Sequence, residues 1–304
     1  MPKPDYQSLI DADIWSFIDR TNAFFPPDSA LHDIAALRSG YDRMCAAFRQ
    51  PLPCGVASRD QPGSVPLRIY ETANPSGTLV YFHGGGFVVG GLESHDDVCA
   101  EICARAGLRV ISVAYRLAPE HRHPAAFTDA LFATRQMSAR YGSVILAGDS
   151  AGGCLAASVA HTLRGSPVRI SGVVLIYPGL GAASGTESMM RHAEAPMLTA
   201  ADIEFYWETH GASRNDTTAA PLLERDFSNL PTTWICGAEC DPLCDDGRLY
   251  AKKIREAGGT ACFRTEPGLV HGWLRARYMS PKAADAFSRI IKAIREISTP
   301  GKAQ

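Results

Sequence analysis

The sequence predicts an α/β fold in which helices cover both faces of a doubly wound, mostly parallel β-sheet. From about residue 67 onward, short β-rich runs alternate with helical windows. The middle runs, such as 108–116 and 170–179, are almost continuously apolar, which is typical of strands buried on both faces. A chain of 304 residues can bury a large core without a metal or a disulfide. We therefore expect one domain spanning 1–304.

The strands and helices are expected to follow one another with short links. Strands are expected at 67–71, 78–83, 108–116, 143–148, 170–179, 232–237 and 260–268. Helices are expected at 94–107, 125–142, 152–165, 245–259 and 282–297. Two segments break this alternation: about 1–55, with helical spacing in two pieces, and 180–230, which contains the helix-like TAADIEFYWETHG. We expect these two segments to fold over the strand ends as a cap.

Composition and charge exclude several classes of partner. The chain is 46% hydrophobic and 20% charged, with a net charge of −2 at pH 7. Its Lys and Arg residues form no stripe that could follow a phosphate backbone, so a nucleic-acid partner is not expected. The N-terminus, MPKPDYQSLIDADIWSF, lacks the apolar core of a signal peptide, and no window approaches the ~20 apolar residues of a membrane span. We therefore expect a cytoplasmic protein without a membrane partner.

The cysteines indicate reduced thiols. Nine is an odd number, and most of them sit inside apolar segments, so buried free thiols are expected rather than bridges. Those in apolar segments are Cys99, Cys103, Cys154, Cys236 and Cys262. Cys236, Cys240 and Cys244 stand four residues apart, but the second pair or the histidines that a structural zinc site needs do not follow. No metal and no cofactor is expected.

Ser150 lies in GDSAG (148–152), between the predicted strand SVILAG and the helical stretch GGCLAASVAHTL. A serine hydroxyl is a poor nucleophile, so it needs an adjacent base and a place for the negative charge that develops. A G-x-S-x-G pattern at a strand-to-helix turn is that of a nucleophile elbow. The pattern predicts Ser150 as a nucleophile, although an ordinary strand-to-helix turn would give the same letters.

A glycine-rich loop, YFHGGGF (81–87), follows another predicted strand. Successive glycines let backbone N–H groups face a cleft without side chains in the way, and HGGG loops supply oxyanion-hole donors in lipases and esterases. The N–H group of the residue after the nucleophile completes such a hole. A phosphate cradle is the weaker reading, because no GK[ST] follows. We expect an oxyanion hole formed by Gly84, Gly85, Gly86 and Ala151.

The base and its orienting acid are expected further along the chain, at strand ends and in the order serine, acid, histidine. His271, in GLVHGWL, follows the last predicted strand, and Asp241, in GAECDPLC, follows TTWICG. Spacing alone also leaves Glu239, Asp245 and Asp246 as candidate acids. Asp149 is too close to Ser150 along the chain to reach the far side of an imidazole.

Together, the motifs resemble the hormone-sensitive-lipase-like family of α/β-hydrolases, the bacterial esterases with an HGGG motif. The matching pieces are HGGGFVVGGLESHD (83–96), YRLAPEHRHPAAFTDA (115–130), GDSAGG (148–153), DPLCDDG (241–247) and HGW (271–273). The resemblance implies the α/β-hydrolase fold, with Ser150 as nucleophile, Asp241 as orienter and His271 as base. It implies an oxyanion hole made by the amides of Gly85, Gly86 and Ala151, with Gly84 supporting the loop.

The resemblance also implies roles outside the reacting groups. His83 is expected to stabilise the glycine loop rather than take part in chemistry. Arg116 and Glu120 of YRLAPE are expected to form internal ion pairs rather than contact substrate. The cap would consist of the N-terminal helices and the 180–230 insertion.

These features predict a serine carboxylesterase that hydrolyses short-chain acyl esters of small molecules through an acyl-enzyme. The same groups could cleave amides, lactones or formamides, and a non-catalytic receptor on this fold, like the plant gibberellin receptors, is the least favoured reading. A homodimer through the final helix or the edge of the last strand is open, although that helix packing on its own sheet is the simpler account. Candidate pocket residues, which could equally be core, are Phe87, Val88, Leu180, Met197, Phe205, Tyr206 and Trp207.

Overall fold

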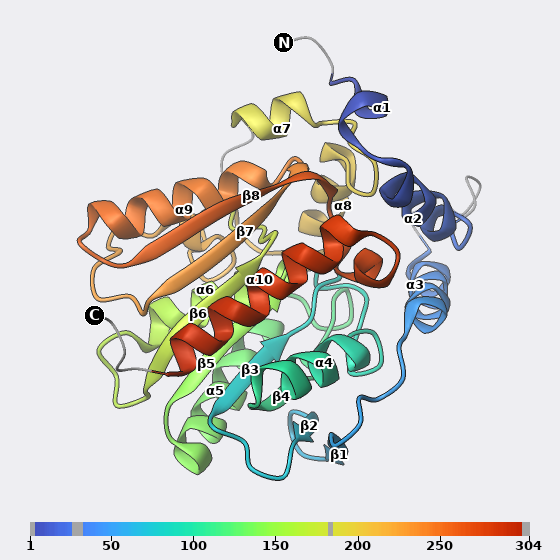
Figure 1. Cartoon of the computed structure of the whole chain (residues 1–304). Coiled ribbons are helices and arrows are strands. Elements are labelled where there is room, and N and C mark those ends of the chain that lie inside the picture. Colours follow the sequence, from blue (N-terminus) through green and yellow to red (C-terminus); the bar gives the residue numbers. More distant parts are fainter. Residues whose placement is uncertain (1–3, 26–32, 182–184, 300–304) are drawn as a thin grey trace.

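An eight-stranded sheet forms the centre of the computed structural model, which describes residues 4–25, 33–181 and 185–299 (Figure 1). The strand order is β1-β2-β4-β3-β5-β6-β7-β8. β1 runs antiparallel to β2 and β2 antiparallel to β4, whereas all the other neighbours are parallel. The predicted mostly parallel α/β sheet is therefore confirmed.

The strands match the predicted runs closely, apart from one that was missed. They are β1 (Ala57–Gln61), β2 (Leu67–Glu71), β3 (Thr78–Phe82), β4 (Arg109–Val113), β5 (Val144–Asp149), β6 (Ile170–Ile176), β7 (Thr233–Cys240) and β8 (Ala261–Val270). The sequence did not indicate β1, because its residues, ASRDQ, are polar and mostly exposed. Such a strand at the sheet edge carries no apolar pattern that could reveal it.

Most helices fall within the predicted windows. The described part of the N-terminal segment, however, holds three helices rather than two helical pieces, and the helix Glu187–Arg191 was not predicted. They are α1 (Tyr6–Leu9), α2 (Ala12–Asn22), α3 (Ile34–Phe48), α4 (Asp96–Ala106), α5 (Ala125–Tyr141), α6 (Ala151–Leu163), α7 (Glu187–Arg191), α8 (Ala200–His210), α9 (Cys244–Glu256) and α10 (Pro281–Ser298). The described residues also form two 3₁₀ helices, η1 (Pro221–Leu223) and η2 (Trp273–Tyr278).

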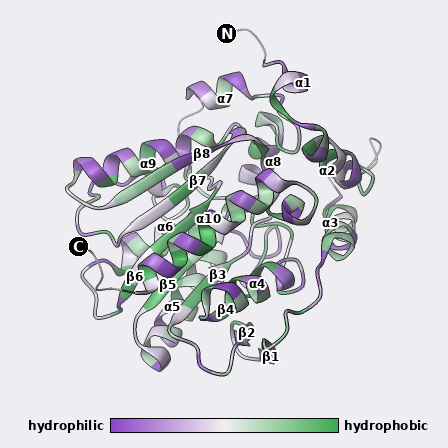
Figure 2. Cartoon of the chain, viewed as in Figure 1, coloured by the Kyte–Doolittle hydropathy of each residue, from purple (hydrophilic) through white to green (hydrophobic). Residues whose placement is uncertain are grey.

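Helices cover both faces of the sheet, and each face has its own apolar core (Figures 1 and 2). On one face, α4 and α10 pack on the central strands, with Cys99 and Phe287 fully buried there. On the other face, α5, α6 and α9 pack against the sheet, with Leu155 and Ala251 buried. Because α10 packs on its own sheet, its strongly apolar face is already covered. Among the described residues, no helix combines the length and apolarity needed to cross a membrane.

The described parts of the two segments expected to form a cap lie together at one end of the sheet. In Figure 1, α7 lies at the top centre, and α1, α2, α3 and α8 lie to its right. The Tyr6 hydroxyl of α1 hydrogen-bonds His192 Nδ1, just after α7, at 3.1 Å, which joins the two segments directly. Residues 26–32 and 182–184 of these segments lie outside the described residues.

The ion pairs expected from YRLAPE are present. The Arg116 guanidinium donates to both carboxylate oxygens of Asp129, at 2.8 and 2.9 Å. Glu120 accepts two hydrogen bonds from Arg38 of α3, both at 2.7 Å.

The cysteine prediction holds only in part. Cys262 is exposed on β8, the last strand of the sheet order, so the prediction that it is buried is wrong.

Candidate active site

Ser150 lies at the apex of the turn between β5 and α6, in a strained backbone conformation. Its φ of 52° and ψ of −118° are rare for a residue with a side chain and persist only where the surroundings enforce them. The Ser150 N–H donates to the Ile176 carbonyl at 2.9 Å, which ties the turn to β6. Gly152 must be glycine, because a Cβ there would lie 1.9 Å from the Phe82 carbonyl oxygen of β3. These contacts hold the serine hydroxyl above the end of the sheet.

His271 lies between Ser150 and Asp241. His271 Nε2 is 2.9 Å from Ser150 Oγ, and His271 Nδ1 is 2.7 Å from Asp241 Oδ2. A carboxylate can only accept, so Nδ1 carries the hydrogen and the neutral ring accepts the Ser150 hydroxyl proton at Nε2. Asp241 is fully buried, and its other oxygen accepts the Leu243 N–H at 2.8 Å. The structure thus brings together the three residues that the sequence order indicated.

The acids that spacing left open have other partners. Glu239 accepts the Gly268 N–H at 2.7 Å, and Asp246 accepts the Leu180 N–H at 2.6 Å. Asp245 accepts the Ser188 N–H at 2.9 Å and pairs with Arg248. Among these carboxylates, Asp241 is the one that contacts His271.

The glycine loop lies beside Ser150 because β3 and β5 are parallel neighbours, with Phe82 opposite Gly148. Its backbone is contorted: Gly85, Gly86 and Phe87 have φ values of 122°, 59° and 65°. Positive φ is readily adopted by glycine but strained for phenylalanine. We therefore expect this loop to keep its shape only where the surrounding structure holds it.

His83 supports the loop from within the core, as the resemblance implied. Its Nδ1 lies 2.8 Å from the Gly84 carbonyl oxygen, and its ring stacks on Tyr115 with centroids 4.2 Å apart. Burial, followed by the positive potential of His95, lowers the pKa of His83 to about 3. The ring is therefore neutral near pH 7 and holds the loop as a hydrogen-bond donor.

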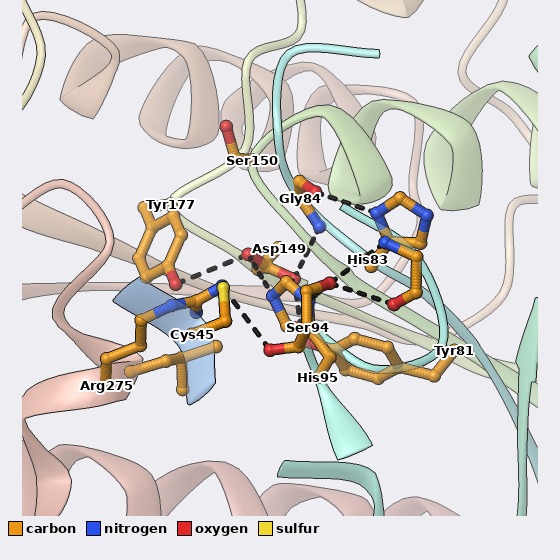
Figure 3. Close-up of polar contacts among 12 residues, drawn as sticks. Cys45, Tyr81, His83, Gly84, Ser94, His95, Asp149, Ser150, Tyr177 and Arg275 are labelled. Atoms are coloured by element: carbon orange, nitrogen blue, oxygen red, sulfur yellow. Dashed lines mark hydrogen bonds and ion pairs between the residues drawn. The ribbon is translucent and has the colours of Figure 1, made fainter. Parts of the chain in front are cut away.

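Asp149, the residue before Ser150, is the centre of a buried polar network (Figure 3). Its Oδ1 accepts the Gly84 N–H at 2.9 Å and the Tyr81 hydroxyl at 2.8 Å. His95 Nε2 approaches the same carboxylate at 3.2 Å, and the Tyr177 hydroxyl lies 3.5 Å from Oδ2. The carboxylate thus joins the nucleophile turn to the start of the glycine loop.

A buried cation offsets the charge of this carboxylate. Burial alone would raise the pKa of Asp149, but the nearby charges of His95 and Arg275 and the hydrogen bonds hold it well below its usual range. Arg275, which is 9% exposed, donates from Nη2 to the Tyr41 hydroxyl at 2.8 Å and to Cys45 Sγ at 3.1 Å. Asp149 is therefore ionised inside the protein.

Sequence reasoning missed these supporting residues. Tyr177 packs its ring on His271, with centroids 4.9 Å apart, and reaches Asp149 on its other side. His95 lies in the matching stretch HGGGFVVGGLESHD (83–96), but nothing in its spacing points to Asp149. Arg275 contacts residues of α3 more than 200 positions earlier in the chain, a relationship that no local pattern reveals.

The candidate pocket residues lie in different surroundings. Val88 and Leu180 are fully buried in apolar clusters, so they have no free surface to offer a ligand. They are core residues here, because each belongs to a cluster of buried apolar side chains. The indole of Trp207 faces Arg214, whose guanidinium carbon lies 5.3 Å from its ring.

Other candidates lie at the glycine loop or near His271. Tyr206 of α8 lies against Gly86, where a Cβ would come within 2.3 Å of its ring, and Phe205 packs edge-on against Tyr206 with centroids 5.4 Å apart. Phe87 stacks on His210. Met197, with a φ of 75°, lies 4.0 Å from where a Cβ would stand on Gly272, next to His271.

Comparison with known proteins gives consistent results. Residues 79–275 match the sequence profile of the α/β-hydrolase fold. The chain is 32% identical to "Ethyl acetate hydrolase" of Pseudomonas putida, over 77% of this chain and 79% of that protein. It is 35% identical to "Carboxylesterase NlhH" of Mycobacterium tuberculosis, over 76% of this chain and 78% of that protein.

A solved structure extends the similarity to most of the chain. The esterase of Pyrobaculum calidifontis superposes with a TM-score of 0.82 at 32% identity, covering 90% of this chain and 95% of its own. The family match spans the glycine loop, Ser150, Asp241 and His271. The chain belongs to the hormone-sensitive-lipase-like family of serine α/β-hydrolases and is a carboxylic ester hydrolase.

Proposed function

We propose that Ser150, His271 and Asp241 are the catalytic triad and that the chain hydrolyses short-chain acyl esters through an acyl-enzyme. The observation that carries the proposal is the continuous hydrogen-bonded line from Ser150 Oγ through both ring nitrogens of His271 to Asp241. In this geometry a base stands ready for the hydroxyl proton, and a buried carboxylate fixes the ring.

The reaction proceeds in two halves. His271 Nε2 takes the Ser150 proton as Oγ attacks the ester carbonyl carbon, and the carbonyl oxygen becomes an oxyanion. The C–O bond to the alcohol then breaks, and the alcohol leaves with the proton from Nε2. Water, deprotonated by His271, attacks the carbonyl carbon of the acyl-enzyme. The tetrahedral intermediate that results then collapses, which releases the carboxylic acid and returns the proton from His271 to Ser150. Asp241 stabilises the imidazolium that forms twice in each turnover.

The oxyanion is proposed to be held by the backbone N–H groups of Gly85, Gly86 and Ala151, while Gly84 anchors the loop through Asp149. Ala151 begins α6, a helix of 13 residues, so its N–H lies at the positive end of the helix dipole. Preorganised amides of this kind are worth about 10²–10³ in turnover each.

Helices α1–α3 and the 180–230 segment are proposed to form a cap that limits the acyl pocket. Tyr206 contacts the glycine loop and Met197 lies beside the His271 loop, so both stand near parts of the proposed site and are the proposed limits of the acyl pocket. Relatives named for ethyl acetate and acetyl esters support a small acyl group. Val88 and Leu180 are left out of the proposed pocket because they are buried.

The experiment is a chain-length series of p-nitrophenyl esters hydrolysed by the wild type and by Ser150→Ala. The proposal expects the highest kcat/KM at acetate or butyrate and loss of nearly all activity in Ser150→Ala. Equal rates in the two proteins reject the triad, and a maximum at long chains rejects the small pocket. Parallel anilide, lactone and formamide substrates test the other acyl-transfer reactions of the same triad.

A further inference from the structure

Residues of α3 and α8 contact three consecutive residues of the glycine loop. Tyr206 of α8 contacts Gly86, His210 at the end of α8 stacks on Phe87, and Arg38 of α3 binds the carbonyl of Val88. Gly86 and Phe87 belong to the part of the loop with positive φ, and Val88 follows it directly. Asp149 holds the same loop from below, at Gly84.

Arg38 makes the most specific of these contacts. Its Nε donates to the Val88 carbonyl at 2.8 Å, and its Nη2 donates to the Ala118 carbonyl at 2.8 Å. The remaining donors form a two-pronged pair with Glu120, which is more than half exposed. A planar guanidinium can hold two carbonyls and a carboxylate at once, which lysine cannot do.

The contact between His210 and Phe87 depends on ring stacking. The two rings are nearly parallel, at 11°, with centroids 4.0 Å apart, and His210 is 2% exposed. Neither ring nitrogen of His210 has a hydrogen-bond partner among the described residues. The imidazole therefore acts here as a flat apolar ring that fixes the strained Phe87.

A small apolar cluster completes the connection. Val88, Val89 and Ala118 are buried against side chains of α3 and α8. Those side chains are Ile34, Leu37, Tyr41 and Tyr206. The loop segment after the oxyanion glycines thus has its own core, and α3 and α8 provide most of that core's outer wall.

We propose that Arg38 and His210 are positioning residues of the oxyanion hole, through which α3 and α8 fix the strained glycine loop. The inference rests on the proposed function, because it assigns the loop amides to the oxyanion. Neither side chain needs to contact the substrate. Each acts through the backbone of residues 85–88, so its loss should affect the transition state more than substrate binding.

The experiment compares Arg38→Gln with Glu120→Gln. Both variants remove the ion pair between the two residues, whereas only Arg38→Gln removes the fork on the Val88 and Ala118 carbonyls. The inference expects kcat to fall about tenfold or more in Arg38→Gln, with KM within about twofold of wild type. Glu120→Gln is expected to lose much less. Equal losses in the two variants, or an unchanged kcat in Arg38→Gln, overturn the role of Arg38.

A second pair of variants keeps the test valid if Arg38→Gln folds poorly. His210→Ala is expected to lower kcat, and His210→Phe, which retains a flat ring, to recover most of that loss. A failure of His210→Phe to recover activity overturns the stacking role. Each variant is also tested against a trifluoromethyl ketone, which forms a tetrahedral oxyanion adduct with an active serine. Its inhibition constant should rise in proportion to the loss of kcat/KM, and an inhibition constant that stays at the wild-type value contradicts the inference.

Ser150→Ala, measured alongside, separates the two levels of the proposal. If Ser150→Ala retains wild-type activity, the proposed function itself fails. If Ser150→Ala is inactive while Arg38→Gln and His210→Ala keep the wild-type kcat, the triad stands and the positioning role fails.

Discussion

The carboxylate of Asp149 accepts the Gly84 N–H at 2.9 Å, so the residue before Ser150 is hydrogen-bonded to the first glycine of the glycine loop. This hydrogen bond joins the turn that carries Ser150 to the glycine loop. His95 and Tyr81 also contact the carboxylate, and the Tyr177 hydroxyl approaches it (Figure 3). The Tyr177 ring packs on His271 as well.

Asp149→Asn should lower both activity and stability. An amide keeps one acceptor for the Gly84 N–H but loses the charge that His95 and Arg275 face. Hydrogen bonds to charged groups are worth about 1.5–3 kcal/mol, so we expect a loss of stability of about that size at pH 7. Urea unfolding measures it, and kcat with p-nitrophenyl butyrate should fall as well.

The pH dependence of that loss has a definite sign. The pKa of Asp149 is lowered in the folded state, so its stabilisation is complete above the unfolded value of about 3.9 and declines as the pH falls below it. The stability difference between wild type and Asp149→Asn should therefore shrink in acid. A difference that grows on acidification contradicts an ionised, stabilised carboxylate.

Asp241→Asn should lower kcat by several orders of magnitude. An asparagine amide can donate a hydrogen bond to His271 Nδ1, where the carboxylate accepts one. The ring is then held in the wrong tautomer, as in other serine triads. Glu239→Gln is the matched control, because Glu239 lies two residues away but contacts the Gly268 N–H instead. Similar losses in both variants would show that the orienting acid has been misassigned.

Gly86→Ala should abolish most activity. A Cβ would lie 2.3 Å from the Tyr206 ring, and the φ of 59° is strained for alanine. The loop must shift to accommodate it, which moves an oxyanion donor and costs on the order of 10²–10³ in kcat. Gly91→Ala is the control in the same segment, since no atom lies within 4 Å of its Cβ position. Wild-type kcat in Gly86→Ala would show that this part of the loop does not serve the oxyanion.

His210 should make the protein sensitive to mild acid. Burial, aided by His123, lowers the pKa of His210 from 6.5 to about 3. Between pH 6.5 and 3 the His210 side chain is protonated in the unfolded chain but neutral in the folded protein, so the free energy of unfolding falls as the pH falls. From pH 6.5 to 5 this one group should cost about 1.5 kcal/mol. His210→Phe should lose correspondingly less in urea unfolding at the two pH values, and an unchanged slope contradicts a buried neutral ring.

The sequence was most informative where chemistry needs a local pattern. GDSAGG, HGGG and the strand-end positions of Asp241 and His271 each have short-range requirements, so they could be predicted with the parallel sheet. The sheet itself is confirmed, and the structure brings Ser150, His271 and Asp241 into one hydrogen-bonded line.

The supporting contacts of the site and the pocket residues could not be predicted, because they depend on contacts between residues far apart in the sequence. Arg38 binds carbonyls 50 and 80 positions away, and Arg275 contacts α3 across the fold. No periodicity encodes such pairings. The pocket residues show the same limit: Phe87 and Val88 are adjacent in sequence, but one stacks on His210 at the loop and the other is core. Burial at that scale is decided by tertiary packing.

The most direct test of the account is to identify the residue that a fluorophosphonate modifies. Wild-type protein, Ser150→Ala and His271→Gln are each treated with the reagent, and the modified peptide is located by mass spectrometry. The account predicts a single phosphonyl adduct on Ser150 in the wild type, none in Ser150→Ala and much slower labelling in His271→Gln. An adduct on a different residue, or equal labelling rates in the wild type and His271→Gln, would contradict it.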